Sequence, residues 1–404
     1  MLNRRRGLCA ALLAAVVLLT AACGTGDSAT PHRPDVDLAS LDIGNLTAEP
    51  RIYDKPTNLD MARVVEAMRL GNHLPLPMEI DPALKYAPLK IASVRMFTTL
   101  SSAAVANRVS GSGTDLESRV SGFITGFVTA GRSDPVKNLS WELDNVALLF
   151  ETEQDAVNAA TVFTDVERTF LAEKAVPQEI PGHPEARAHL LSGTNGWINS
   201  FYPVGRFLLL TEVRDNVMQQ LETTDAERLR TRVAQSIEAV RPALESFEPT
   251  PADELMKLDV DPERVLSRTL NTVDDPAQFG IPGVFDRNGG LQISLDPESD
   301  SAMFEQAGVD TVGWKGAYVY RTRDAVAAEQ LLAQRTKVRK LYRPAPAPPN
   351  LPFARCMQYL VPGGGSVYYC GVTFERYTAE VTASQLQDVH QRISAQYAIL
   401  ARSK

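Results

Sequence analysis

Residues that build metal and nucleophile sites are scarce in this chain of 404 residues, which has four cysteines, five histidines and three tryptophans. No two histidines show the H-E-x-x-H or H-x-H spacing of zinc ligands. The G-x-S-x-G and S-x-x-K patterns of serine acyl enzymes are missing, as is the Gly-Lys-Thr of a phosphate loop. These absences favour a protein without catalytic activity, and the sequence predicts no metal and no cofactor.

Basic residues do not predominate either, because 41 Lys and Arg stand against 49 Asp and Glu, giving a net charge of −8. Nucleic acids and anionic bilayers bind surfaces with clustered Lys and Arg. We therefore expect no nucleic-acid partner and no membrane attachment through charge.

A continuous apolar run without charge occupies residues 8–19, after three arginines at 4–6 and before Thr-Ala-Ala-Cys at 20–23. Its length, about twelve residues, is below the roughly twenty that a spanning helix needs. The layout is that of a bacterial lipoprotein signal peptide. It predicts that residues 1–22 are removed, that the thiol of Cys23 carries a palmitate-type diacylglycerol, and that the protein is anchored to the outer face of the cell membrane. An ordinary signal peptide is the alternative.

Two cysteines, Cys356 and Cys370, remain once Cys9 is removed with the leader and Cys23 is lipidated. Exported chains meet oxidising conditions, so the pair predicts a disulfide. Strand-like runs flank a Pro-Gly-Gly-Gly turn, and a hairpin turning about Gly363 would place the two cysteines directly opposite each other. A redox or metal pair is less favoured, because there is no C-x-x-C spacing and no adjacent histidine in the sequence.

The segment after the lipid site is rich in Thr, Ser, Pro and Asp, which predicts a flexible tether over residues 23–50. Within it, Pro-Asp-Val-Asp-Leu at 34–38 and Leu-Asp-Ile-Gly-Asn at 41–45 resemble the opening of actinobacterial cell-envelope lipoproteins, of mycobacterial and nocardial type, in a domain-of-unknown-function family. The resemblance implies a cell-envelope location and a body in two parts. It implies no catalytic residues.

Repeated patterns indicate an internal duplication. A buried-strand pattern at 145–150 precedes the Asp-Ala-Val at 155–157 that opens a helix, and a similar pattern at 316–320 precedes Asp-Ala-Val at 324–326, 169 residues later. Pro-rich crossings follow at 177–184 and at 344–352.

Each copy closes with a helix that carries one apolar stripe, over 229–244 in the first and 386–400 in the second. Capping boxes are predicted to begin these helices, from Thr224 to Glu227 and from Ser384 to Gln387.

The repeat unit, β-α-β-β-(β)-α, predicts an α+β fold with two duplicated units. In each unit we expect an antiparallel sheet covered by helices on one side, in a ferredoxin-like style. The expected domains are 51–248 and 262–404, joined by a linker at 249–261.

Aromatic residues around the predicted hairpin suggest a ligand surface formed by Tyr359, Tyr368 and Tyr369. Strand alternation places Tyr368 and Tyr369 on opposite faces of the sheet. Aromatic side chains in strands also fill cores. His183, Glu185 and His189 could gather a metal, but a polar turn entering a strand explains them more simply.

Together these features predict a non-catalytic, lipid-anchored binding or interaction protein of the cell envelope, whose partner is a cell-wall component, a lipid or another envelope protein. An envelope hydrolase with a dispersed active site and a structural spacer remain as alternatives.

Overall fold

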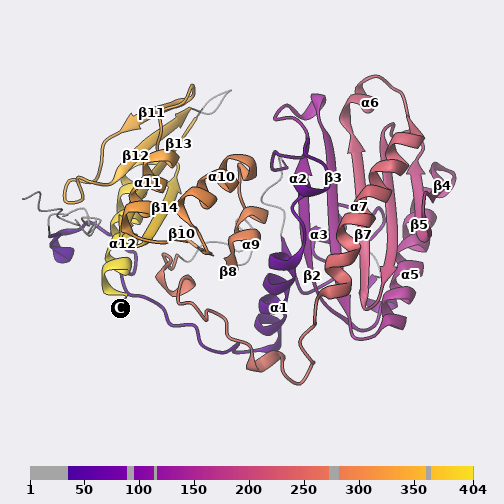
Figure 1. The fold of residues 1–404 in the computed structure, drawn as a ribbon, viewed down its shortest axis with the longest axis horizontal. Helices are drawn as coiled ribbons and strands as arrows, with labels where there is room; N and C mark the ends of the chain where they lie inside the picture. Colours follow the sequence, from indigo (N-terminus) through magenta and orange to yellow (C-terminus); the bar gives the residue numbers. More distant parts are fainter. Residues whose placement is uncertain (1–34, 89–94, 113–115, 273–281, 361–364, 404) are drawn as a thin grey trace, which may run out of the picture.

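The computed structural model describes residues 35–88, 95–112, 116–272, 282–360 and 365–403, which form two seven-stranded antiparallel sheets (Figure 1). The first sheet has the strand order β1-β2-β3-β7-β6-β5-β4, and the second has the order β11-β12-β13-β14-β10-β9-β8. The strands of the first are β1 Met96–Phe97, β2 Phe123–Arg132, β3 Trp141–Phe150, β4 Ala175–Ile180, β5 His183–Leu191, β6 Trp197–Val204 and β7 Phe207–Asp215. Those of the second are β8 Gly283–Asp286, β9 Thr311–Trp314, β10 Tyr318–Arg321, β11 Tyr342–Ala345, β12 Arg355–Leu360, β13 Ser366–Phe374 and β14 Tyr377–Ala383.

The sheet topology confirms the predicted duplication and the α+β class. Read from β8, the second sheet has the order of the first with every strand number raised by seven. The sheets are wider than a ferredoxin-like sheet because the segments expected as Pro-rich crossings form edge strands, β4 and β11. Each edge strand contains a proline, Pro177 or Pro344, which lacks the amide N–H that a further strand would pair with.

Helices cover both faces of each sheet, so the expectation of one-sided coverage is wrong. On β3, Val146 and Leu148 belong to the core beneath α5, whereas Ala147 and Leu149 belong to the core beneath α7 and α1. Successive strand residues point to opposite faces, and both sets here are apolar. The helices are α1 Leu59–His73, α2 Pro77–Ile80, α3 Ala103–Ala106, α4 Leu116–Arg119, α5 Glu153–Leu171, α6 Asn216–Gln220, α7 Ala226–Ser246, α9 Arg287–Gln292, α10 Pro297–Ala307, α11 Ala325–Arg335 and α12 Leu386–Arg402.

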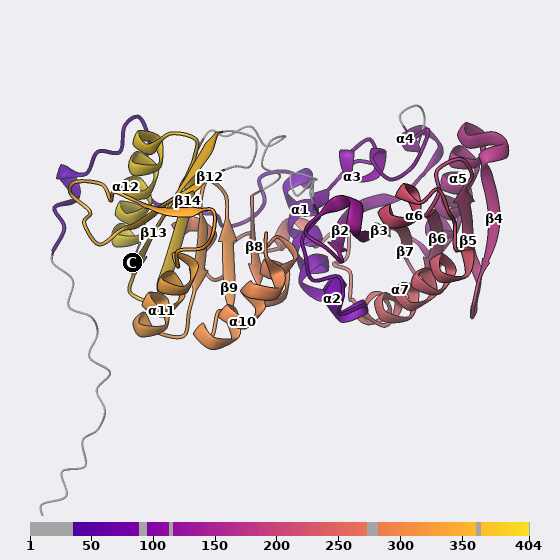
Figure 2. The ribbon, with the colours of Figure 1, turned by 90° about the horizontal axis from the view of Figure 1, so that it is seen from above.

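The two copies are turned relative to each other. In Figure 2, α5 lies above the first sheet and α7 below it, whereas α11, the counterpart of α5, lies below the second sheet and α12 lies above it. The inner edge strands β1 and β8 both contact α1. The copies are therefore related by an approximate two-fold rotation about a line near α1.

Helix α1 joins the two copies. Gly71 lies so close to the ring of Phe127 on β2 that a Cβ atom would overlap it. On the other side, Nδ2 of Asn288 in α9 donates to the carbonyl oxygens of Asn72 and Leu74 at 2.9 and 2.8 Å. The two copies thus pack together through one helix that contacts both.

Part of the predicted tether is packed against the second copy. Leu41 and Ala48 are 7% and 6% exposed within the core beneath α12. Arg402 Nη1 donates to the carbonyl oxygen of Ala48 at 2.8 Å, and Asn350 Nδ2 donates to that of Ser40 at 2.6 Å. Apolar side chains within the polar segment explain the difference, because Leu41 and its neighbours are buried in the apolar core beneath α12. The rest of the predicted tether lies outside the described residues.

The helix starts differ from the predicted capping boxes. The N-cap of α7 is Asp225, whose carboxylate accepts from the Arg228 amide at 3.0 Å, and not Thr224. Helix α12 begins after Gln385, which makes no side-chain cap hydrogen bond. A carboxylate is as good an N-cap as a hydroxyl, so in α7 the neighbouring aspartate takes the position.

Among the described residues, no helix combines the length and apolar content needed to cross a bilayer.

Candidate ligand site

A groove opens at the end of the first sheet where β3 begins and β7 ends, beside α6 and the start of α7. The groove has a volume of about 430 Å³, which is within the range of small-molecule sites. Helix α6 stands between β7 and α7, whereas the second copy passes from β14 to α12 without such a helix. The groove therefore belongs to the first copy. It is lined by Leu139, Trp141, Asp215, Val217, Met218, Leu221, Thr223, Asp225, Arg228 and Arg232.

Three side chains from different elements form the floor of the groove. The guanidinium of Arg232 lies over the Trp141 ring, 4.0 Å from its centroid, and donates from Nη1 to Asp215 Oδ2 at 2.7 Å. Asp215 Oδ1 also accepts from the Met218 amide at 3.0 Å and so begins α6. Burial lowers the pKa of Arg232, and Asp215 opposes that shift, so the guanidinium stays charged. At the floor of the groove, the charges of Arg232 and Asp215 therefore balance each other above the Trp141 ring.

Apolar side chains form the rim. Leu139 in η2 (Lys137–Leu139) is 62% exposed, Leu221 after α6 is 67% exposed and Val217 is 38% exposed. Elements η2 and α6 lie in contact, so these side chains gather on one surface. A gathered apolar surface beside a groove is typical of a binding site, whereas single exposed apolar residues are ordinary.

A cationic side chain stands at the mouth. Arg228 Nε lies 3.4 Å from Asp225 Oδ2, with side-chain exposures of 59% and 46%. An ion pair this exposed is weak. The guanidinium of Arg228 is therefore available to an anionic group on a ligand.

The predicted tyrosines divide between the two faces of the second sheet, as strand alternation requires. Tyr368 packs toward the core beneath α12. Tyr369, paired with Met357, and Tyr359, two residues along β12, face the other side. The Tyr359 ring lies 4.9 Å from that of Tyr342. Contact of these rings with a ligand stays a prediction.

Burial encloses the Tyr369 hydroxyl near Arg335 and Glu380, and raises its pKa well above the ordinary value. Arg335 bridges Glu380 on β14 and Asp300 on α10. This cluster joins the layers of the second copy and leaves Tyr369 little freedom.

The predicted disulfide between Cys356 and Cys370 is confirmed, with the two residues directly opposite each other in the register of β12 and β13 and their Cα atoms 4.1 Å apart. Cys23, the predicted lipid site, and Gly363, the predicted turn, lie outside the described residues.

His183 and His189 do not share a site with Glu185. His189 is 1% exposed, and its Nε2 lies 3.0 Å from Oε2 of Glu167 on α5. His183 Nε2 lies 4.0 Å from Glu238 of α7, and Glu185 is exposed. Neither histidine lines the groove.

A buried polar row, which sequence analysis missed, crosses the first sheet at four directly paired positions: Asp144, Glu212, Asn199 and His189. Arg108 Nε donates to Asp144 Oδ2 at 2.8 Å, and Arg214 Nη2 donates to Glu212 Oε2 at 2.8 Å, in the first two of these positions. Charged residues within otherwise apolar strands were the available signal. The ion pairs with Arg108 and Arg214, together with the burial of the row, indicate a structural role.

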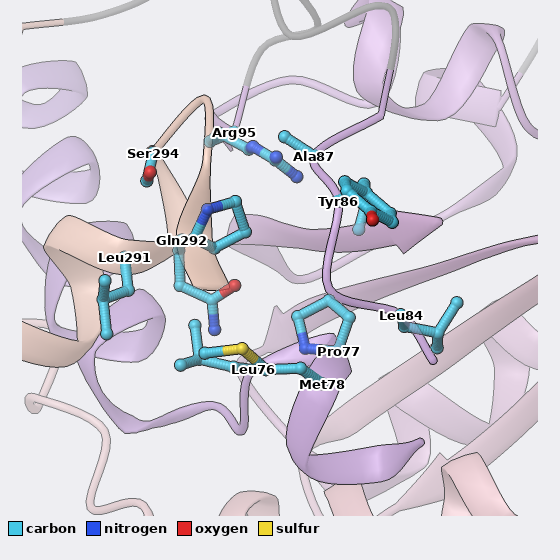
Figure 3. Close-up of a pocket in the computed structure, with 12 residues that line it drawn as sticks. Leu76, Pro77, Met78, Leu84, Tyr86, Ala87, Arg95, Leu291, Gln292 and Ser294 are labelled. Carbon is cyan, nitrogen blue, oxygen red and sulfur yellow. The ribbon is translucent and has the colours of Figure 1, made fainter. Parts of the chain in front are cut away.

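A second cavity lies between the copies, beside α2 and α9 (Figure 3). It leaves about 10 Å³ for the centre of a water molecule, room for about one water. Arg95 points along it and donates from Nη1 to the Val128 carbonyl oxygen at 3.3 Å. Burial lowers the pKa of Arg95 to about 10. The cavity is too small for a metabolite, so the groove is the stronger candidate.

Two family models match the chain, the N-terminal part of a domain of unknown function, DUF7373, over residues 53–260 and the C-terminal part of the same domain over 264–403. The chain belongs to the DUF7373 family. The groove falls within the N-terminal DUF7373 part, and the tyrosines and the disulfide fall within the C-terminal part.

No curated protein matches this DUF7373 chain. Among solved structures, the extracellular domain of PknH from Mycobacterium tuberculosis is similar, with 11% identity and a TM-score of 0.27 over 43% of this chain and 96% of that one. At this score the similarity supports no conclusion about fold or function.

Proposed function

We propose that the protein is a lipid-anchored binding protein on the outer face of an actinobacterial cell membrane, and that the groove beside α6 takes an amphiphilic envelope ligand. Location and ligand rest on separate observations, which are tested separately.

The sequence supports the anchor. Residues 1–22 have the layout of a lipoprotein signal peptide, and Cys23 stands at its cleavage site. The disulfide between Cys356 and Cys370 fits an oxidising compartment. The resemblance of residues 34–45 to actinobacterial envelope lipoproteins points the same way.

The packed segment limits how far the body stands from its anchor. Between Cys23 and Asp35, where the described residues begin, there are residues 24–34. Eleven residues span at most about 40 Å when fully extended. The segment would therefore hold the end of the second copy that contacts residues 41–48 within about 40 Å of the membrane surface.

The inference of an amphiphilic ligand rests on one observation: an exposed apolar rim lies beside a cationic side chain. Leu139, Val217 and Leu221 offer surface for an alkyl chain, and Arg228 at the mouth offers a weakly held guanidinium for an anionic head group. A wholly polar sugar would leave the rim in water. A protein that inserts an apolar side chain is the alternative occupant.

The anchor is tested with the full-length chain expressed in an actinobacterium. We expect the membrane fraction to contain a chain that starts at Cys23 and carries the mass of a diacylglycerol. Cys23→Ala should leave the leader uncleaved and remove the added mass. A wild-type chain of unmodified mass in the culture medium would refute the anchor and leave the groove untouched.

The ligand is tested with the chain from Gly24 onward, produced for export in the same host and weighed by native mass spectrometry. We expect a retained mass of a few hundred daltons that organic solvent extracts. Leu221→Asp should abolish retention, because a carboxylate would stand in the apolar rim.

Leu295→Asp is the matched control, because Leu295 is 66% exposed and Leu221 is 67% exposed. Equal retention by both variants would place the ligand outside the groove. A bare wild-type chain would shift weight to a protein partner or to a spacer, and turnover of an envelope ester or glycan would favour a hydrolase.

A further inference from the structure

The disulfide has a histidine beside it that the sequence does not place there. His390 lies on α12, which covers the sheet face that carries Cys356 and Cys370. The two sulfurs and a ring nitrogen of His390 all lie within 4.8 Å of one another. Among the described residues, this is the one group of three or more Cys, His, Asp or Glu side chains close enough to share an ion.

The imidazole is held by the backbone in a tautomer suited to ligation. His390 Nε2 lies 2.7 Å from the carbonyl oxygen of Pro346, which can only accept a hydrogen bond. Nε2 therefore carries the proton, and Nδ1 of the neutral ring keeps its lone pair. A backbone carbonyl that orients the ring in this way is the usual support of a metal-binding histidine.

The sulfurs become ligands only when the bond between them is broken. A dithiol reductant would supply two electrons and two protons, cleaving the S–S bond to two thiols while the reductant becomes a disulfide. A cation that then binds both sulfurs releases the two protons. In a tetrahedral zinc site with Zn–S bonds of about 2.3 Å, two sulfurs lie about 3.8 Å apart. Cα atoms 4.1 Å apart on one face of a hairpin can present them at that separation.

We propose that the reduced chain holds a thiophilic cation of the Zn²⁺ class through Cys356, Cys370 and His390, so that this corner of the second copy is either a disulfide or a metal site. Two thiolates and an imidazole suit Zn²⁺ and exclude Ca²⁺ and Mg²⁺, which take oxygen ligands. Three protein ligands leave the fourth position open to water or to a ligand.

The burial of the three residues fits a site that forms without unfolding the copy. Cys370 is 0% exposed and Cys356 is 6% exposed, while His390 is half-buried at the surface. A cation would therefore enter from the side of α12 and of the segment that carries Pro346.

The test uses Co²⁺ as a spectroscopic substitute for Zn²⁺ and the chain from Gly24 onward, in which Cys356 and Cys370 are the two cysteines. After anaerobic reduction with a non-thiol phosphine, we expect one equivalent of Co²⁺ to produce a thiolate charge-transfer band. The oxidised chain should produce none. His390→Gln should weaken the affinity of the reduced chain at least tenfold.

His73→Gln is the control, because His73 Nε2 lies 3.0 Å from Ser246 Oγ, in contact with the first copy and far along the chain from the disulfide. It should leave the Co²⁺ affinity unchanged. Near-ultraviolet circular dichroism of the reduced, metal-free chain reports whether the second copy stays folded. The proposal is overturned if the reduced chain is unfolded, if it gives no charge-transfer band, or if His390→Gln binds Co²⁺ as tightly as the wild type.

Discussion

Arg206 and Arg376 make the same contact in the two copies. Arg206 Nε donates to the carbonyl oxygen of Phe150 at 2.9 Å, and Arg376 Nε donates to that of Thr322 at 2.7 Å. Each arginine directly precedes a strand, β7 or β14, and its side chain donates to the last residue of β3 or to the residue directly after β10. From that residue the chain continues into a helix, α5 or α11. The arginine thereby fixes where the helix begins on the sheet.

Arg206→Ala should therefore destabilise the first copy by about 1 kcal/mol, the net value of a typical side-chain hydrogen bond. The Phe150 amide keeps its own bond to the Arg206 carbonyl at 2.9 Å, so the turn itself should persist. Urea unfolding followed by far-ultraviolet circular dichroism gives the difference. Arg343→Ala, at an exposed position of β11, is the control and should change the free energy of unfolding by a few tenths of a kcal/mol at most.

The duplication could be inferred from sequence, although the motif that suggested it is not the structural match. Asp324 is the N-cap of α11, whereas the N-cap of α5 is Thr152 and Asp155 lies inside the helix. The true offset before the helices is 172 residues, from Thr152 to Asp324, against the 169 of the repeated Asp-Ala-Val. Aspartate and threonine are both good N-caps, so the N-cap is threonine in one copy and aspartate in the other. The repeated Asp-Ala-Val sequence therefore falls at different positions of the two helices.

The disulfide was predictable because register in a hairpin follows from the centre of its turn. The groove was not, because it depends on α6, a five-residue helix without periodicity, and on three elements meeting in space. Nor was the proximity of His390 to the cysteines, since only the packing of α12 on the sheet creates it. Local patterns predict elements, while contacts distant in sequence require the fold.

The disulfide should contribute stability to the second copy alone. Replacing both Cys356 and Cys370 by Ser should lower its free energy of unfolding by about 3 kcal/mol, the chain-entropy value for a closed loop of about 15 residues. Denaturant unfolding monitored by fluorescence, with and without reduction of the wild type, measures it. The double variant and the reduced wild type should agree, and the double variant should be insensitive to reductant. A wild type that loses no stability on reduction would contradict the expectation.

The effect of Gly71→Ala on stability tests whether the helix propensity of residue 71 or its close contact with Phe127 has the larger effect in α1. In an exposed helix the change would stabilise by about 1 kcal/mol. Here the new Cβ would overlap the Phe127 ring, so we expect a net loss of about 1 to 3 kcal/mol. Thermal unfolding of Gly71→Ala, Phe127→Leu and the double variant closes a mutant cycle. The alanine should cost less in the Phe127→Leu background, where the smaller side chain leaves room for the Cβ, and additive effects would show that the contact is not limiting.

Glu212 should make stability fall as pH rises. Burial raises the pKa of Glu212 from 4.5 to about 7, although Arg214 beside it acts in the opposite direction. Between pH 4.5 and about 7 the native state holds this proton and the unfolded state has lost it, so the free energy of unfolding decreases with pH across that window and levels off above it. The decrease is at most about 3 kcal/mol. Glu212→Gln should flatten the slope measured by urea unfolding, whereas Glu179→Gln, at an exposed position, should retain it. The same slope in both variants would mean that Glu212 is ionised in the native state throughout, held by Arg214 and by Arg108 on the neighbouring Asp144.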